Sequence, residues 1–187
     1  MFDTERFIAA CQQAMAETEP RLAVRDVLDE ALHAPTSIGD VLKPESGGVT
    51  LLHHAPELTV IHAVWPPGIQ LFPHNHNMWA AIGVYAGRED NEFFRRSEAG
   101  ASTITETSGG RQLNVGDVLL LGDDVIHAVA NSTDRVTAAI HVYNGDFVHH
   151  PRSAWGPGPR DERPHDMQEL AKVFADANAA WKEQEQQ

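Results

Sequence analysis

The 187-residue sequence is poor in cysteine, in basic residues and in long apolar runs. Cys11 is the single cysteine, so an internal disulfide is excluded, and with no recognisable secretory leader we expect a cytoplasmic protein. No apolar run approaches the roughly 18 residues that a membrane-spanning helix needs. Lys and Arg number 14 against 27 Asp and Glu, and the resulting net charge of −13 argues against nucleic-acid and membrane partners.

The length is enough for one domain with a sizeable core and short for two. Apolar residues recur at helical spacing over residues 3–18, again from Pro20, and once more after Pro164. We therefore expect a single domain over residues 1–187. It would consist of a helical flap at 1–36, with a boundary near residue 34, a β-barrel at 49–143, and an irregular loop and a C-terminal helix at 144–187.

Between these helices the period changes from helical to alternating, which predicts short strands. The expected strands are Val49–His53, Leu58–Trp65, Met78–Ala86, Glu89–Ser97, Ser102–Thr107, Arg111–Asn114, Val118–Leu121, Val125–Val129 and Val136–Tyr143. Turns are expected between them, among others at Gly109-Gly110. Many short strands at this spacing predict an all-β sandwich or barrel, with the helices packed outside.

Eleven histidines are many for this length, and two of them stand two residues apart. In an extended segment His74 and His76 leave the same face of the strand, so each can give one nitrogen to a divalent metal ion. His127 is the candidate for a third ligand. Seven further histidines lie outside these positions and outside the last predicted strand. We expect their side chains to be hydrogen-bonded or exposed to solvent, without a functional role; they are His33, His53, His54, His62, His149, His150 and His165.

The segment around the paired histidines resembles the first motif of the cupin superfamily, which is a glycine, five residues, H-x-H, three or four residues, a glutamate, six residues and a glycine. Gly68, His74, His76 and Gly87 fall in register. Ala80 stands where the motif has its glutamate. The resemblance implies a cupin fold, a double-stranded β-helix or jelly-roll barrel.

A second segment, in the right order along the chain, resembles the second cupin motif. Gly116, His127 and Asn131 fall in register, whereas Gly122 and Asp124 replace the motif's proline and glycine. Two spaced motifs are much stronger evidence than one H-x-H alone. The resemblance covers the middle third of the chain.

The missing glutamate matters for the chemistry of the site. Three neutral imidazoles leave the full charge of a divalent ion uncompensated, together with open coordination positions. A substrate thiolate would meet both demands. Asp123 and Asp124 precede His127, and we interpret them as turn residues rather than ligands.

The last predicted strand carries two polar residues on one face. Ala139, His141 and Tyr143 share that face, and Ile140 and Val142 share the other. The apolar pair should pack outward under a helix, so we expect His141 and Tyr143 to point into the barrel and to form a hydrogen bond. They are the candidate catalytic residues.

These features together resemble the thiol dioxygenases, the cysteine dioxygenase-like cupins. The resemblance implies iron(II) held by His74, His76 and His127, and oxidation of a small thiol by O2 to a sulfinate. His141 and Tyr143 fall on a pair beside the family's metal, and Trp65 falls on a pocket tryptophan. The expected pocket residues are Trp65, Met78 and Arg95.

Some positions depart from this family. Ala139 replaces a serine, Ala81 stands where some members have a cysteine, and residues 50–53 lack the arginine that holds the carboxylate of cysteine. Arg88, Arg95 and Arg96 are alternative arginines, but alternation allows only one of the last two to point inward. A mercapto-carboxylate is therefore expected as substrate rather than cysteine.

The residues leave three other interpretations open. A three-histidine cupin could cleave a non-thiol substrate such as a diketone with O2. A zinc cupin could act as a hydrolase or isomerase with His141 as its base, and a non-catalytic cupin could simply bind a small ligand. We expect the protein to be a monomer or a homodimer.

Overall fold

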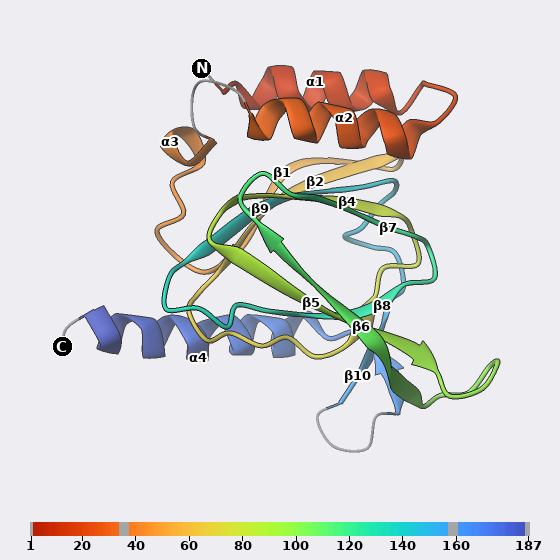
Figure 1. Ribbon diagram of the computed structural model, residues 1–187. Coiled ribbons are helices and arrows are strands. Elements are labelled where there is room, and N and C mark those ends of the chain that lie inside the picture. Colours follow the sequence, from red (N-terminus) through yellow and green to blue (C-terminus); the bar gives the residue numbers. More distant parts are fainter. Residues whose placement is uncertain (1, 34–37, 157–160, 186–187) are drawn as a thin grey trace.

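The computed structural model describes residues 2–33, 38–156 and 161–185, and two antiparallel sheets form its core (Figure 1). The first sheet has five strands in the order β1 (Gly48–Ala55), β2 (Leu58–Trp65), β9 (Thr137–Tyr143), β4 (Ala80–Ala86) and β7 (Val118–Leu121). The second has six, in the order β11 (Glu162–Pro164), β10 (Ser153–Trp155), β3 (His74–Asn75), β8 (Ile126–Ala130), β5 (Arg88–Arg96) and β6 (Ile104–Asn114).

The chain crosses repeatedly between the sheets, from β4 to β5, from β7 to β8 and from β8 to β9. Strands that are consecutive in the sequence therefore lie mostly in different sheets, which is the arrangement of a jelly roll. Gly87 makes the first of these crossings with a φ of +68°, and a Cβ atom there would lie 2.5 Å from the carbonyl oxygen of Val136. Glycine is thus required at this crossing.

Helices α1 (Thr4–Ala14) and α2 (Pro20–Leu32) cover the outer face of the five-stranded sheet (Figure 1). Leu28 of α2 packs in one buried cluster with Ile140 and Val142 of β9. Burial of each such side chain contributes about 1.5–3 kcal/mol, so this contact fixes which face of β9 turns outward. A short helix that the sequence did not predict, α3 (Ile38–Leu42), precedes β1.

Helix α4 (Met167–Glu185) lies on the other side of the barrel (Figure 1). Phe174 stacks on the indole of Trp65, with ring centroids 5.5 Å apart, and the Asn178 side chain bonds both backbone polar groups of Gly47. The prediction of an all-β core with helices packed outside is confirmed. None of the helices in the described part of the chain is long and apolar enough to cross a membrane.

Two details of the prediction were wrong. Gly109-Gly110 does not separate two strands, because β6 runs from Ile104 to Asn114, with a shift in its register against β5 between Gly110 and Glu106. A Cβ on Gly110 would lie 2.9 Å from the Asn91 carbonyl oxygen, so this glycine marks a close backbone approach within the sheet. The segment 144–164 is not wholly irregular, because β10 and β11 extend the second sheet beside β3. The helix boundary predicted at residue 34 lies outside the described residues.

Candidate metal centre

Three histidines meet inside the barrel because β3 pairs with β8. His74 lies directly opposite His127 in this pairing, and His76 follows two residues after His74. One nitrogen from each ring lies within 4.8 Å of the other two, and Nε2 of His76 is 3.2 Å from Nε2 of His127. Metal–nitrogen bonds of 2.0–2.1 Å at tetrahedral angles place ligand nitrogens about 3.4 Å apart. The three side chains therefore fit a single metal ion with little movement.

Burial keeps these imidazoles neutral. Desolvation lowers the pKa of His74 to about 3 and holds the pKa values of His76 and His127 well below their ordinary range. Nδ1–H of His74 donates to the Phe72 carbonyl (3.1 Å), and Nδ1–H of His127 donates to Oδ1 of Asn91 (2.7 Å). On both rings the unprotonated nitrogen is then Nε2, which is the form that binds a metal.

The position of the missing glutamate is on the inner face of the barrel. Ala80 is fully buried at the start of β4, in one apolar cluster with Ile82 and Tyr143. Asp123 and Asp124 are exposed in the turn before β8, as expected for turn residues. Among the described residues, the metal-binding group around His74 thus consists of three neutral imidazoles without a carboxylate.

The three histidines line a small pocket of about 60 Å³ together with the side chains of Trp65, Phe72, His141, Tyr143, Phe147, Arg152 and His165, among others. Pockets that bind drug-sized ligands have volumes of roughly 300–1,000 Å³, so this pocket suits a much smaller molecule.

Arg152 brings a positive charge to this pocket. Its guanidinium lies 3.9 Å above the centre of the Phe147 ring, and Phe147 in turn stacks on Tyr143 at 3.9 Å. Burial lowers the pKa of Arg152, against an opposing effect of Tyr143. No carboxylate in the described ranges lies within ion-pairing distance of it. The sequence did not indicate this residue, which lies in an aperiodic loop after β9.

The inward face of β9 carries the other two polar groups. The hydroxyl of Tyr143 donates to Nδ1 of His141 at 3.1 Å, and the Tyr143 ring packs edge-on against His76 with centroids 5.0 Å apart. Burial raises the pKa of Tyr143, so the phenol stays protonated. Ile140 and Val142 face the helices, whereas His141 and Tyr143 line the pocket, so the two faces of β9 point in the directions that the alternation predicted.

Comparison with solved structures gives the same architecture. The protein BH2720 of Bacillus halodurans is 16% identical, with a TM-score of 0.51 over 75% of this chain and 97% of that chain. A Klebsiella pneumoniae protein with a double-stranded β-helix domain is 12% identical (TM-score 0.46; 67% and 100% covered), and a Desulfitobacterium hafniense cupin superfamily protein is 13% identical (0.46; 61% and 93%). The strand order of the two sheets gives this chain the double-stranded β-helix of the cupin fold. No family model matches the sequence.

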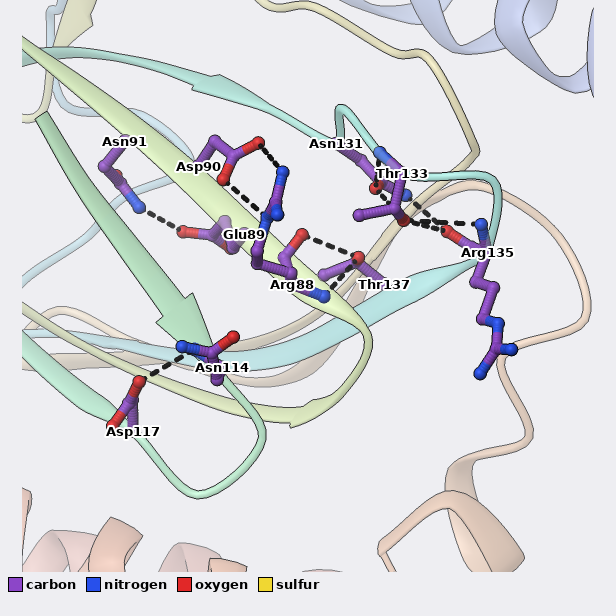
Figure 2. Close-up of polar contacts among 10 residues, drawn as sticks. All are labelled: Arg88, Glu89, Asp90, Asn91, Asn114, Asp117, Asn131, Thr133, Arg135 and Thr137. Carbon is purple, nitrogen blue, oxygen red and sulfur yellow. Dashed lines mark hydrogen bonds and ion pairs between the residues drawn. The ribbon is translucent and has the colours of Figure 1, made fainter.

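A carboxylate that the sequence analysis did not select lies buried in this cupin barrel. Glu89 is fully buried and receives hydrogen bonds from Nε1–H of Trp65 (2.7 Å), Nδ2–H of Asn91 (2.9 Å) and Nε2–H of His141 (3.3 Å). Figure 2 shows its contact with Asn91. With the proton of His141 on Nε2, both oxygens act only as acceptors, as they do in the ionised form. Burial opposes ionisation, but the bonds from His141, Asn91 and Trp65 hold the pKa of Glu89 below its ordinary value.

These bonds form one continuous chain through the cupin core. It runs from His127 through Asn91 and Glu89 to His141 and ends at Tyr143. The chain fixes which nitrogen carries the proton on both histidines, because Asn91 and Glu89 each accept from one of them. Strand alternation was the available signal, since it places Glu89 and Asn91 together on the inward face of β5.

Asn131 of the second cupin motif has a structural position. Its Nδ2 donates to the carbonyl oxygens of Trp65 (2.9 Å) and Arg135 (2.7 Å), and its Oδ1 accepts from Thr133. Figure 2 shows its contacts with Thr133 and Arg135 in the turn between β8 and β9. Asn131 therefore fastens this turn to the end of β2, which carries Trp65.

The structure does not bring two of the expected pocket residues to the site. Met78 is buried in the cluster around Ile82 and does not line the pocket. Arg95 is exposed on the outer face of β5 and lines a separate depression. Arg96 and Arg88 are engaged in ion pairs, with Glu162 and Asp90 respectively. Of the three arginines considered from the sequence, none lines the pocket of the three histidines.

Proposed function

We propose that this cupin is a mononuclear non-haem iron dioxygenase that oxidises a small mercapto-carboxylate to its sulfinate. The balanced reaction is RS⁻ + O2 → RSO2⁻. One observation carries the proposal: the pocket that holds the neutral, carboxylate-free group of three histidines also holds Arg152, a cation without an acidic partner among the described residues. A substrate with one thiolate and one carboxylate would neutralise both.

The histidine group supports a metal that keeps positions open for a substrate. Iron(II) bound by His74, His76 and His127 would supply a redox centre that can take up both a thiolate and O2. The protein contributes three neutral, buried nitrogens, so the positive charge of the ion is not reduced by its own ligands. An anionic sulfur ligand is favoured for that reason.

Arg152 is suited to hold the carboxylate. A guanidinium binds a carboxylate through two parallel N–H···O bonds, and its plane must be fixed for this to be specific. Stacking on Phe147 fixes that plane. The small volume of the pocket limits the substrate to a short chain between sulfur and carboxylate.

Tyr143 and His141 can accept the proton of the entering thiol. The Tyr143 hydroxyl donates to Nδ1 of His141, so its oxygen is free to accept from the pocket side. We infer that the S–H bond breaks as a new O–H bond forms on Tyr143, while the original phenol proton moves to Nδ1 of His141. The resulting imidazolium would be stabilised by the ionised Glu89 beside its Nε2–H.

Oxygen uptake by iron-reconstituted protein tests the proposal. We expect uptake with a short mercapto-carboxylate and formation of the sulfinate by mass spectrometry. Arg152→Gln should raise KM for the carboxylate substrate roughly tenfold to a hundredfold, the size of about 1.5–3 kcal/mol for a hydrogen bond to a charged group. A neutral mercapto-alcohol should be affected little, and Arg95→Gln should change neither.

Three outcomes would favour the alternatives. Uptake with a diketone but with no thiol would replace the thiol by a non-thiol substrate. Zinc as the metal that co-purifies with the protein, together with hydrolysis, would favour the hydrolase. A site that binds a small ligand without turnover would favour a binding protein.

A further inference from the structure

A second group of possible metal ligands, separate from the three buried histidines, lies at the surface of the barrel. It consists of His54, Asp146 and His149, and one ligand atom from each lies within 4.8 Å of the other two. Nε2 of His54 is 2.7 Å from Oδ1 of Asp146, and Nδ1 of His149 is 2.8 Å from Oδ2 of the same carboxylate. The Asp146 carboxylate is thus in contact with both imidazoles.

The fold of the loop after β9 holds two of these groups in place. Oδ1 of Asp146 accepts the backbone N–H of His149 (3.0 Å), and the Asp146 carbonyl accepts the N–H of His150 (2.9 Å). This turn puts the side chains of Asp146 and His149 on the same side. His54, near the end of β1, comes from 92 residues earlier in the chain. The group is therefore built by tertiary structure and is not a local sequence motif.

We propose that His54, Asp146 and His149 form a second site for a divalent transition-metal ion such as Zn²⁺. Two imidazole nitrogens and one carboxylate oxygen are a common set of zinc ligands, and water can fill the fourth position. Bond lengths of 2.0–2.2 Å require ligand atoms about 3.4 Å apart. Oδ1 of Asp146 lies 2.7 Å from Nε2 of His54 and 3.1 Å from Nδ1 of His149, so these separations must widen by about 0.7 and 0.3 Å. His149 has a side chain that is 72% exposed, so its ring can move this far without disturbing the core.

A metal ion there would act on the pocket through Phe147. This residue lies between Asp146 and His149 in the turn, and its ring stacks on Tyr143 on one side and lies beneath Arg152. A bound ion would tie the turn to the β1–β2 hairpin through His54. The site would then restrain the segment that carries Phe147, whatever reaction the central pocket performs.

Zinc binding to metal-free full-length protein tests this site. Equilibrium dialysis against Zn²⁺ should give two ions per wild-type chain and one per His149→Ala or Asp146→Asn chain. Asparagine keeps the capping oxygen of Asp146, and His149 is largely exposed, so both variants should fold. His150→Ala, which removes a neighbouring exposed histidine outside the group, is the matched control and should still bind two ions.

The two sites are distinguished by a variant of the central one. His127→Ala should lose one ion and keep the one that depends on His149. Zn²⁺ should also slow amide hydrogen exchange over residues 146–149 in wild type and in His127→Ala, but not in His149→Ala. If wild type binds a single ion that His127→Ala abolishes, or two ions that His149→Ala leaves untouched with no change in exchange, the proposed site is refuted.

Discussion

Replacing Glu89 by glutamine should be costly although the two side chains have nearly the same shape. The carboxylate receives three donors, Trp65 and His141 at Oε2 and Asn91 at Oε1. Glutamine has one accepting oxygen and one donating NH2 group. If its oxygen faces Trp65 and His141, its NH2 group meets the NH2 group of Asn91. If the amide is turned around, its NH2 group meets the indole N–H of Trp65, which can only donate.

Repair requires a change at the metal ligands themselves. Rotation of the Asn91 amide would offer an oxygen to glutamine, but it would remove the acceptor of Nδ1–H of His127. The proton of His127 would then have to move to Nε2, which lies 3.2 Å from Nε2 of His76. Where that proton stays on Nδ1, one buried donor is left unsatisfied, at a cost of about 1–3 kcal/mol. We expect Glu89→Gln to lower the free energy of unfolding of the metal-free protein by roughly 2 kcal/mol.

Two measurements check this expectation. Urea unfolding of metal-free protein gives the loss of stability, and the exposed Glu98→Gln should give none. The ¹⁵N shifts of the imidazoles report whether His127 and His141 keep their protons on Nδ1 and Nε2. If Glu89→Gln were as stable as wild type with unchanged imidazole and indole signals, Glu89 would have to be protonated already. The argument that its three donors require an ionised carboxylate would then fail.

Two further predictions concern the metal ligands. Ala80→Glu should lower the melting temperature of the metal-free protein, because Ala80 is fully buried. The new carboxylate should nevertheless slow the loss of metal to a chelator and reduce O2 uptake with a thiol. Unchanged turnover per iron would show that residue 80 does not reach the metal. Metal-free protein should also lose stability from pH 7 to pH 5.5. His74, His76 and His127 have folded-state pKa values well below 6.5, so the unfolded state takes up the protons first. The loss is about 1.3 kcal/mol for each histidine, roughly 4 kcal/mol in all, and urea unfolding at both pH values measures it; a flat profile would mean that the folded rings protonate normally.

Short-range sequence patterns, such as alternation along a strand, predicted the features that depend only on residues close together in the chain. The alternation in β9 separates Ile140 and Val142, which pack under α2, from His141 and Tyr143, which line the pocket. It succeeded because the strand is buried on both faces by partners of different chemistry. The spacing of His74 and His76 indicated a shared face, and their pairing with His127 follows from the register of β3 and β8.

Features that depend on which strands become neighbours could not be predicted in this way. Strand β10 has three residues, too few for a periodic signal, and Trp155 is buried there because its indole reaches the Ser102 carbonyl. Arg152 enters the pocket only because its loop folds back over Phe147. In the sequence, His54 and His149 are far apart, so neither was predicted to belong to a group of ligands. Asp146 brings their side chains together in the folded chain.

The orientation of His141 depends on a residue of a neighbouring strand. Ala139 shares one face of β9 with His141, and alanine offers no hydrogen-bond partner. In the structure the Nε2–H of His141 finds its acceptor on a different strand, in Glu89 of β5. A carboxylate accepts a stronger hydrogen bond than a neutral oxygen does. Glu89 therefore fixes the orientation of His141 toward Tyr143 and places a negative charge in the middle of the hydrogen-bonded chain.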